Sequence, residues 1–161
     1  MKQSIITVAS KKLVGINTRT NNIDEMDYSK AKIGMTFAKF YNEALAEQIK
    51  FRINPCKVFS VYTDYESDHK GDYTYFVGEE VESFQENDRF ERILIPAQKY
   101  AKFTIGPGVI PEIVIDAWQK IWAMDEKALG GQRTFLADFE IYDSRSVDFS
   151  NSTVEIFIGI S

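Results

Sequence analysis

The chain carries the same order of elements twice, and this repeat limits the fold more than any single motif. In each half, segments with the alternation of a β-strand lead into a helical stripe, which is followed by two further strand segments. The first half has strand segments 4–9, 13–18, 57–65 and 73–81, with a helix that begins near Tyr28. The second half has strand segments 99–105, 135–142 and 153–160, with a helix from Pro111 to about Met124.

Short pieces also match between the halves. VFSVYTD (58–64) can be set against DFEIYDS (138–144), and TYFVGEEV (74–81) against VEIFIGIS (154–161). The order and spacing of these pieces predict an α+β fold made of a duplicated β-α-β-β unit. We expect a largely antiparallel sheet with two helices on one side and a central ligand groove where the halves meet.

The length of 161 residues suits a single domain. We expect this domain to span 1–161, with halves of about 1–82 and 93–161. The segment 84–92 is interpreted as a charged connection without periodicity. Asp27 or Ser29 is expected to cap the first helix.

Charge and composition narrow the function classes. The formal net charge is −5, from 19 Lys plus Arg and 24 Asp plus Glu. Direct nucleic-acid binding is disfavoured because it needs a positive surface. A negative field attracts cationic ligands, although the same charge also serves solubility. The 12 Phe, 8 Tyr and 2 Trp include more Tyr than a core needs, which is typical of pockets and interfaces.

Residues for catalysis or metal binding form no pattern. Cys56 is the only cysteine and His69 the only histidine, so a Cys–His pair or a zinc cluster would lack converging ligands. The turn 106–108 before the second helix lacks the Lys-Ser/Thr pair of a phosphate loop. We expect no catalytic residues, no metal and no cofactor. One cysteine and an N-terminus without a long apolar run predict a cytoplasmic protein with no membrane span.

Alternation along the strand segment 135–142 singles out Glu140. One face carries Leu136, Asp138, Glu140 and Tyr142, and the other carries Ala137, Phe139 and Ile141. The second face is apolar and is expected to pack under the helices. In the closing strand segment, Val154, Ile156 and Ile158 form the core face, which leaves Glu155, Phe157 and Gly159 on the other.

The repeat supplies neighbours for Glu140. The matched pieces add Tyr62 from VFSVYTD and Phe76 from TYFVGEEV. These two residues, with Tyr142 and Phe157, are predicted to floor the groove around Glu140. On the second helix, Trp118 and Trp122 are neighbours at i and i+4. Trp118 is assigned to the core and also kept among the ligand-binding residues, and Trp122 is placed at the groove edge.

A carboxylate partly removed from water favours a cationic partner, and aromatic faces attract cations. Glu140 with these rings therefore predicts a site for lipophilic organic cations. The alternative is a solvated Glu140 on an exposed sheet face, paired with a Lys or Arg.

Several segments together resemble a known family. They are Leu13-Val14-Gly15, Ile33-Gly34, the run 61–65, Tyr73 to Val81 with Gly78, the run 100–104, Ile110-Pro111-Glu112 with Ala117-Trp118, the run 138–143 and Val154-Glu155-Ile156. This pattern resembles the GyrI-like or AraC-type effector-binding domain of regulators such as Rob and BmrR. It is closest to the stand-alone integron-cassette modules that bind cationic drugs. The resemblance implies that Glu140 is the counter-charge of a bound cation.

The resemblance also leaves alternatives open. Some members are hydrolases of reactive small molecules, and one acts as a gyrase inhibitor through protein interaction. The helix-turn-helix of the regulators is missing from this chain, so a role in transcription would need a separate DNA-binding regulator as partner. A homodimer is a further alternative.

Overall fold

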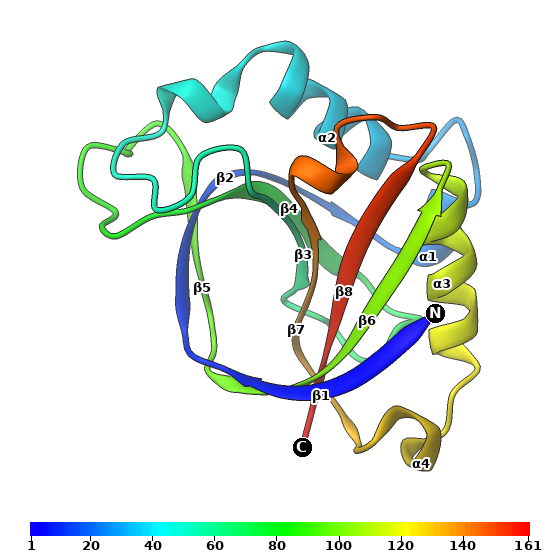
Figure 1. Ribbon diagram of the computed structural model, residues 1–161. Helices are drawn as coiled ribbons and strands as arrows, with labels where there is room; N and C mark the ends of the chain where they lie inside the picture. Colours follow the sequence, from blue (N-terminus) through cyan, green and yellow to red (C-terminus); the bar gives the residue numbers. More distant parts are fainter.

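The computed structural model describes all residues, 1–161, as one curved sheet with helices outside it (Figure 1). The strands are β1 Lys2–Val8, β2 Lys11–Thr20, β3 Val58–Thr63, β4 Tyr73–Glu80, β5 Glu91–Ile95, β6 Gln98–Gly108, β7 Arg133–Tyr142 and β8 Ser152–Ile160. The helices are α1 Asn22–Glu25, α2 Ile33–Asn42, α3 Glu112–Trp122 and α4 Glu126–Leu129, with short 3-10 turns at Leu45–Gln48 and Ser144–Ser146. This is the α+β fold that the sequence predicts.

The order of the strands reflects the repeated order along the chain. The sheet runs β1-β6-β8-β7-β3-β4-β2-β5, and every neighbouring pair is antiparallel. When β1–β4 are exchanged with β5–β8, the same order is obtained in reverse, as a two-fold pseudo-symmetry requires. The seam between the halves is the β3–β7 pair, in which Ser60 lies opposite Glu140. The limits of the two halves remain a prediction.

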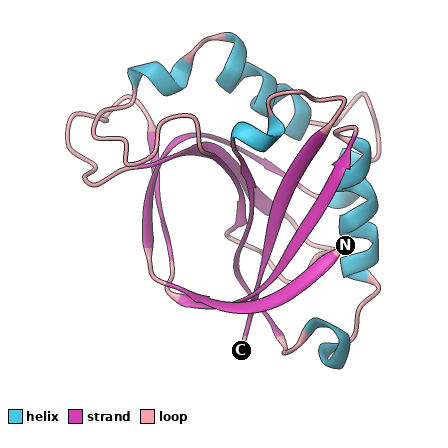
Figure 2. Ribbon diagram, viewed as in Figure 1, coloured by secondary structure: helices cyan, strands magenta, loops and turns pink.

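The sheet curls until its inner face encloses a core of its own (Figures 1 and 2). Inside the curl lies a cluster of ten buried residues: Leu13, Phe59, Val61, Phe76, Ile95, Tyr100, Ala137, Phe139, Ile141 and Phe157. The rings of Phe139 and Phe157, from neighbouring strands, stack at a centroid distance of 4.5 Å. This inner cluster closes the concave side of the sheet.

The outer, convex face carries α2 and α3 (Figure 2). Both helices present apolar stripes to the sheet, and in α3 the buried residues are Val114, Ala117, Trp118 and Ile121. Their spacing of three and four residues places these side chains on one helix face. The sheet residues beneath them include Tyr75, Tyr142, Ile156 and Ile158, which belong to a second buried cluster.

The sequence assigned the wrong face of β7 to the helices. Ala137, Phe139 and Ile141 were expected under the helices, but they lie in the inner cluster, while Tyr142 packs in the outer one beside the buried Glu140. Alternation separates the two faces of a strand without saying which one the helices cover. Here both faces are buried, because the sheet curls around one core and carries the helices on the other side.

Three local predictions also differ from the structure. Strand β5 begins at Glu91, within the segment 84–92 that was interpreted as a connection, and continues to Ile95. It pairs with β2 as an edge strand. Helix α2 begins at Ile33, not near Tyr28. Its first amides, of Lys32 and Ile33, donate to the Glu25 carboxylate at 2.9 and 3.1 Å, so neither Asp27 nor Ser29 caps this helix.

The inner cluster should contribute strongly to the stability of the sheet. We expect Phe157→Ala to lower the free energy of unfolding by about 3–5 kcal/mol, since it removes a stacked ring from a closed core. Leu136→Ala, at a side chain that is 55% exposed on β7, is the matched control, with a change of about 0.5 kcal/mol or less. Urea denaturation measures both. A loss below about 1 kcal/mol for Phe157→Ala would contradict the burial of this ring in a closed core and would favour its position in an open groove.

Candidate functional site

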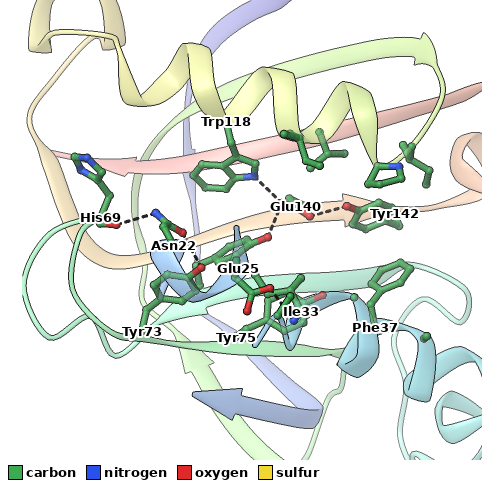
Figure 3. Close-up of a pocket in the computed structure, with 18 of the residues that line it drawn as sticks. Asn22, Glu25, Ile33, Phe37, His69, Tyr73, Tyr75, Trp118, Glu140 and Tyr142 are labelled. Atoms are coloured by element: carbon green, nitrogen blue, oxygen red, sulfur yellow. Dashed lines mark hydrogen bonds between the residues drawn. The ribbon is translucent and has the colours of Figure 1, made fainter. Parts of the chain in front are cut away.

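A cavity of about 620 Å³ lies between the outer sheet face and the two long helices. Its walls come from α1, α2, β3, β4, α3, β7 and the loop that carries His69 (Figure 3). The aromatic residues that line it are Phe37, Tyr41, Tyr62, Tyr65, Tyr73, Tyr75, Trp118, Trp122, Tyr142 and Phe149. Such a volume is typical of small-molecule sites.

Glu140 lies in the wall of this cavity and is only 2% exposed. Its Oε2 accepts hydrogen bonds from Trp118 Nε1 at 2.7 Å and from the Tyr62 hydroxyl at 2.8 Å. Its Oε1 accepts one from the Tyr142 hydroxyl at 2.6 Å (Figure 3). Three donors from α3, β3 and β7 therefore hold the carboxylate in one orientation.

The repeat explains why two tyrosines reach the same carboxylate. Tyr62 and Tyr142 occupy equivalent positions in the matched pieces, on the two strands that form the seam. Tyr142 is two residues after Glu140 and so projects from the same face. Ser60 takes the place of Glu140 in the first half, and its hydroxyl lies 2.9 Å from that of Tyr75.

No basic side chain neutralises Glu140. All three of its partners are uncharged, and it takes part in no ion pair. Burial therefore raises the pKa of Glu140, while its hydrogen bonds with Tyr142, Trp118 and Tyr62 oppose that rise. Burial, and then the nearby Glu140 charge, likewise raises the pKa of Tyr62 and of Tyr142 well above the ordinary value.

Arg133 is the one lysine or arginine in the cavity wall, and its charge is already matched. Its guanidinium lies 2.6 Å from the carboxylate of Asp138, which is fully buried. Asp138 also accepts from the Tyr65 hydroxyl at 2.6 Å and from the amide of Gly159 at 2.8 Å. Asp138 thus matches the charge of Arg133, although the buried Nε of Arg133 has no hydrogen-bond partner, and Glu140 is left without a cation.

A second carboxylate, that of Glu25, also lines the cavity. Besides the two amides that begin α2, it accepts a hydrogen bond from the Thr20 hydroxyl at 2.6 Å.

Near one end of the cavity, the His69 ring is stacked on Trp122 at a centroid distance of 6.3 Å, and Trp122 is 38% exposed. Trp122 therefore lies at the edge of the cavity.

The structure brings four of the six predicted ligand-binding residues together. Glu140, Tyr62, Trp118 and Tyr142 meet in the cavity wall, and their role toward a ligand stays a prediction. Placing Phe76 and Phe157 in the groove is wrong. Both rings lie in the inner cluster, on the opposite face of the sheet from Glu140. The face of the sheet assigned to them was reversed.

Sequence reasoning missed several lining residues. Tyr73 and Tyr75 alternate on one face of a strand, which is a signal that could have found them. Phe37 lies on the apolar stripe of α2, and such a stripe does not distinguish a cavity wall from core packing. Glu25 carries no local signal, because its position depends on how α1 folds back between β2 and α2.

No group of three or more His, Cys, Asp or Glu side chains is placed to hold a metal ion. Cys56 is a free and exposed thiol. None of the helices has the length and apolar character needed to cross a membrane.

The sequence comparison gives the family. The model of the Cass2 family, described as integron-associated effector binding protein, matches residues 4–160. The chain belongs to this family. A relative in Bacillus subtilis (strain 168), YobU, is 32% identical over 155 residues, which cover 93% of this chain and 92% of YobU. YobU is named as a candidate transcriptional regulator.

Solved structures agree with this assignment. The integron cassette protein VCH_CASS2 of Vibrio cholerae has a TM-score of 0.78 and 30% identity, over 99% of this chain and 95% of that one. SAV2435, solved bound to tetraphenylphosphonium, also has a TM-score of 0.78, over 100% of this chain and 94% of that one. At 18% identity, SAV2435 shows that the fold is shared.

The raised pKa of Glu140 predicts a pH dependence of stability. The folded protein binds this proton more tightly than the unfolded chain, so folding is favoured at low pH. That contribution is lost as pH rises from the ordinary pKa of 4.5 through the raised pKa of the folded state. Each unit of difference corresponds to about 1.4 kcal/mol.

Glu140→Gln removes this titration. The free energy of unfolding of the wild type, minus that of the variant, should therefore fall across this window and stay level on either side. Urea denaturation at several pH values measures it, and Glu66→Gln, at an exposed carboxylate, controls for the loss of one negative charge. A pH-independent difference for Glu140→Gln would contradict the raised pKa.

Proposed function

We propose that this effector-binding protein binds lipophilic organic cations in the cavity, with Glu140 as the counter-charge. The observation that carries the proposal is a buried carboxylate in an aromatic cavity without a basic partner. The proposed ligand-binding residues are Glu140, Tyr62, Trp118 and Tyr142.

The charge of Glu140 favours a cation over a neutral ligand. Burying an ionised carboxylate is costly unless charge or hydrogen bonds compensate. Three neutral donors compensate in part, but burial still raises the pKa of Glu140. A bound cation supplies the missing opposite charge, in a site where water screens the attraction weakly.

The donors to Glu140 also favour a particular kind of cation. A carboxylate has about four lone-pair positions, and three of them are already occupied here. A cation that relies on charge and on contact with ring faces fits better than one that needs several new hydrogen bonds. Each ring face adds about 0.5–2 kcal/mol of cation–π attraction.

The relatives support this proposal. SAV2435 was solved with tetraphenylphosphonium, a permanent cation covered by four phenyl rings. The family description names effector binding, and YobU is named as a candidate regulator. We therefore also infer a sensory role in the cytoplasm, in which ligand occupancy is passed to a DNA-binding regulator or to a second copy of the chain.

Binding without chemistry is the version that the geometry favours. A general base must be free to accept a proton from the attacking water. Both Glu140 oxygens already accept hydrogen bonds from the protein, so activating a water would require one of the donors to leave. This arrangement suits a fixed counter-charge better than a hydrolase.

The test compares a cation with a neutral molecule of similar shape. We expect Glu140→Gln to weaken tetraphenylphosphonium binding by about 10- to 100-fold, or about 1.4–2.7 kcal/mol. Triphenylphosphine oxide, which is neutral, should change by less than about threefold. Calorimetry and quenching of Trp fluorescence measure both ligands, and Glu66→Gln controls for the loss of one negative charge elsewhere.

Equal losses for the two ligands would remove Glu140 from the counter-charge role. Failure of the wild type to bind tetraphenylphosphonium or any other lipophilic cation would overturn the proposed function itself.

A further inference from the structure

Glu25 is a second carboxylate in the cavity wall, and the proposed function does not use it. It belongs to α1, whereas Glu140 belongs to β7, so the two acidic groups reach the cavity from different elements (Figure 3). Like Glu140, it forms no ion pair. The cavity therefore contains two acidic groups, and its only Lys or Arg is bound to Asp138.

The Glu25 carboxylate is held in place by uncharged donors. The Thr20 hydroxyl and the amides of Lys32 and Ile33 occupy three of its lone-pair positions. The ammonium of Lys32 is directed elsewhere and donates to the carbonyl of Arg19 at 2.9 Å. The amino end of α2 supplies only a partial positive charge to Glu25, about half an elementary charge.

The fields of the two carboxylates overlap inside the cavity. Tyr73 and Tyr75, neighbours on one face of β4, both line it. Burial is the main cause that raises the pKa of Tyr73, followed by the charges of Glu25 and then Glu140. The pKa of Tyr75 is raised by burial, with Glu140 and Glu25 among the further causes. Both side chains thus experience negative charge from two sides.

From this arrangement we propose that the cavity takes ligands with two separated positive centres, one at Glu140 and one at Glu25. The proposal rests on the proposed function, since it adds a second charge to the same site. Glu25 is then a specificity-determining residue that distinguishes dications from monocations, in addition to capping α2. A cation without N–H groups suits Glu25 as it suits Glu140, because it leaves the existing donors in place.

The cavity has room for such a ligand. Its volume of about 620 Å³ is within the range of sites for drug-sized molecules. The ring centroids of Tyr73 and Tyr75 are 5.7 and 5.5 Å from that of Tyr62. An apolar spacer can therefore contact several rings of the cavity wall.

The experiment compares two series of ligands that are matched in chain length. One series is the α,ω-bis(trimethylammonium)alkanes of increasing length, and the other is the alkyltrimethylammonium ions of the same lengths. For the wild type we expect an optimum length at which the dication binds about tenfold or more tightly than its monocation. Calorimetry at low ionic strength measures the affinities, since salt screens charge.

The variants assign that excess to Glu25. Glu25→Gln should abolish the tenfold excess of the dication and weaken monocation binding by a smaller factor, because only the dication places a positive centre at Glu25. Asp24→Asn, which removes an adjacent carboxylate that does not line the cavity, should keep the excess. Glu140→Gln should weaken both series.

Because Glu25 also caps α2, a second variant separates the two roles. Thr20→Val removes the hydroxyl donor and is expected to lower thermal stability, but it keeps the charge and should keep the dication excess. Equal losses in Thr20→Val and Glu25→Gln would assign the effect to the cap and overturn the proposal.

Equal affinity of dication and monocation at every length, with tetraphenylphosphonium still bound through Glu140, would overturn the second centre alone. Failure of all cations to bind the wild type would instead overturn the proposed function on which it rests.

Discussion

The burial of the Glu140 carboxylate without a positive charge beside it is the constraint on which the site depends. An isolated charge in the outer core would be expelled or neutralised. Here it is retained because two hydroxyls and an indole N–H converge on it from three elements. These donors tie α3 to the β3–β7 seam, so the same hydrogen bonds hold the helix against the sheet and keep the carboxylate at the cavity wall.

The curl of the sheet stabilises the fold enough to tolerate a buried carboxylate on the outer face. The inner cluster, with its stacked Phe139 and Phe157, buries one face of the sheet. The outer face is then free to carry a cavity and polar groups between the helices. A flat sheet with one apolar face would have to place its helices on that face, and Glu140 would lie in water.

The repeated order predicted the antiparallel sheet, and the apolar spacing predicted the two long helices. Alternation along 135–142 singled out Glu140, and the family resemblance gave it the central role. The limit of the alternation was the choice of face: the pattern around Phe139 was correct, but the apolar side faces the interior of the curl. Phe76 and Phe157 were misplaced for that reason. Glu25 was missed because its contacts join residues of β2, α1 and α2, and β5 was missed because an edge strand rich in charge lacks the usual pattern.

The halves share a frame, but only one of them carries a buried carboxylate, and the register of the seam explains why. Ser60 and Glu140 are equivalent in the repeat and lie directly opposite each other on β3 and β7. A glutamate at both positions would place two like charges across the seam, in a region closed to water, which is destabilising. With Ser60 uncharged and engaged by Tyr75, the equivalent Tyr62 is free to turn its hydroxyl toward Glu140. The duplication thus provides two tyrosines that donate to one carboxylate. The second carboxylate of the cavity, Glu25, belongs to α1 and lies outside the seam, where it does not face Glu140 across the β3–β7 pair.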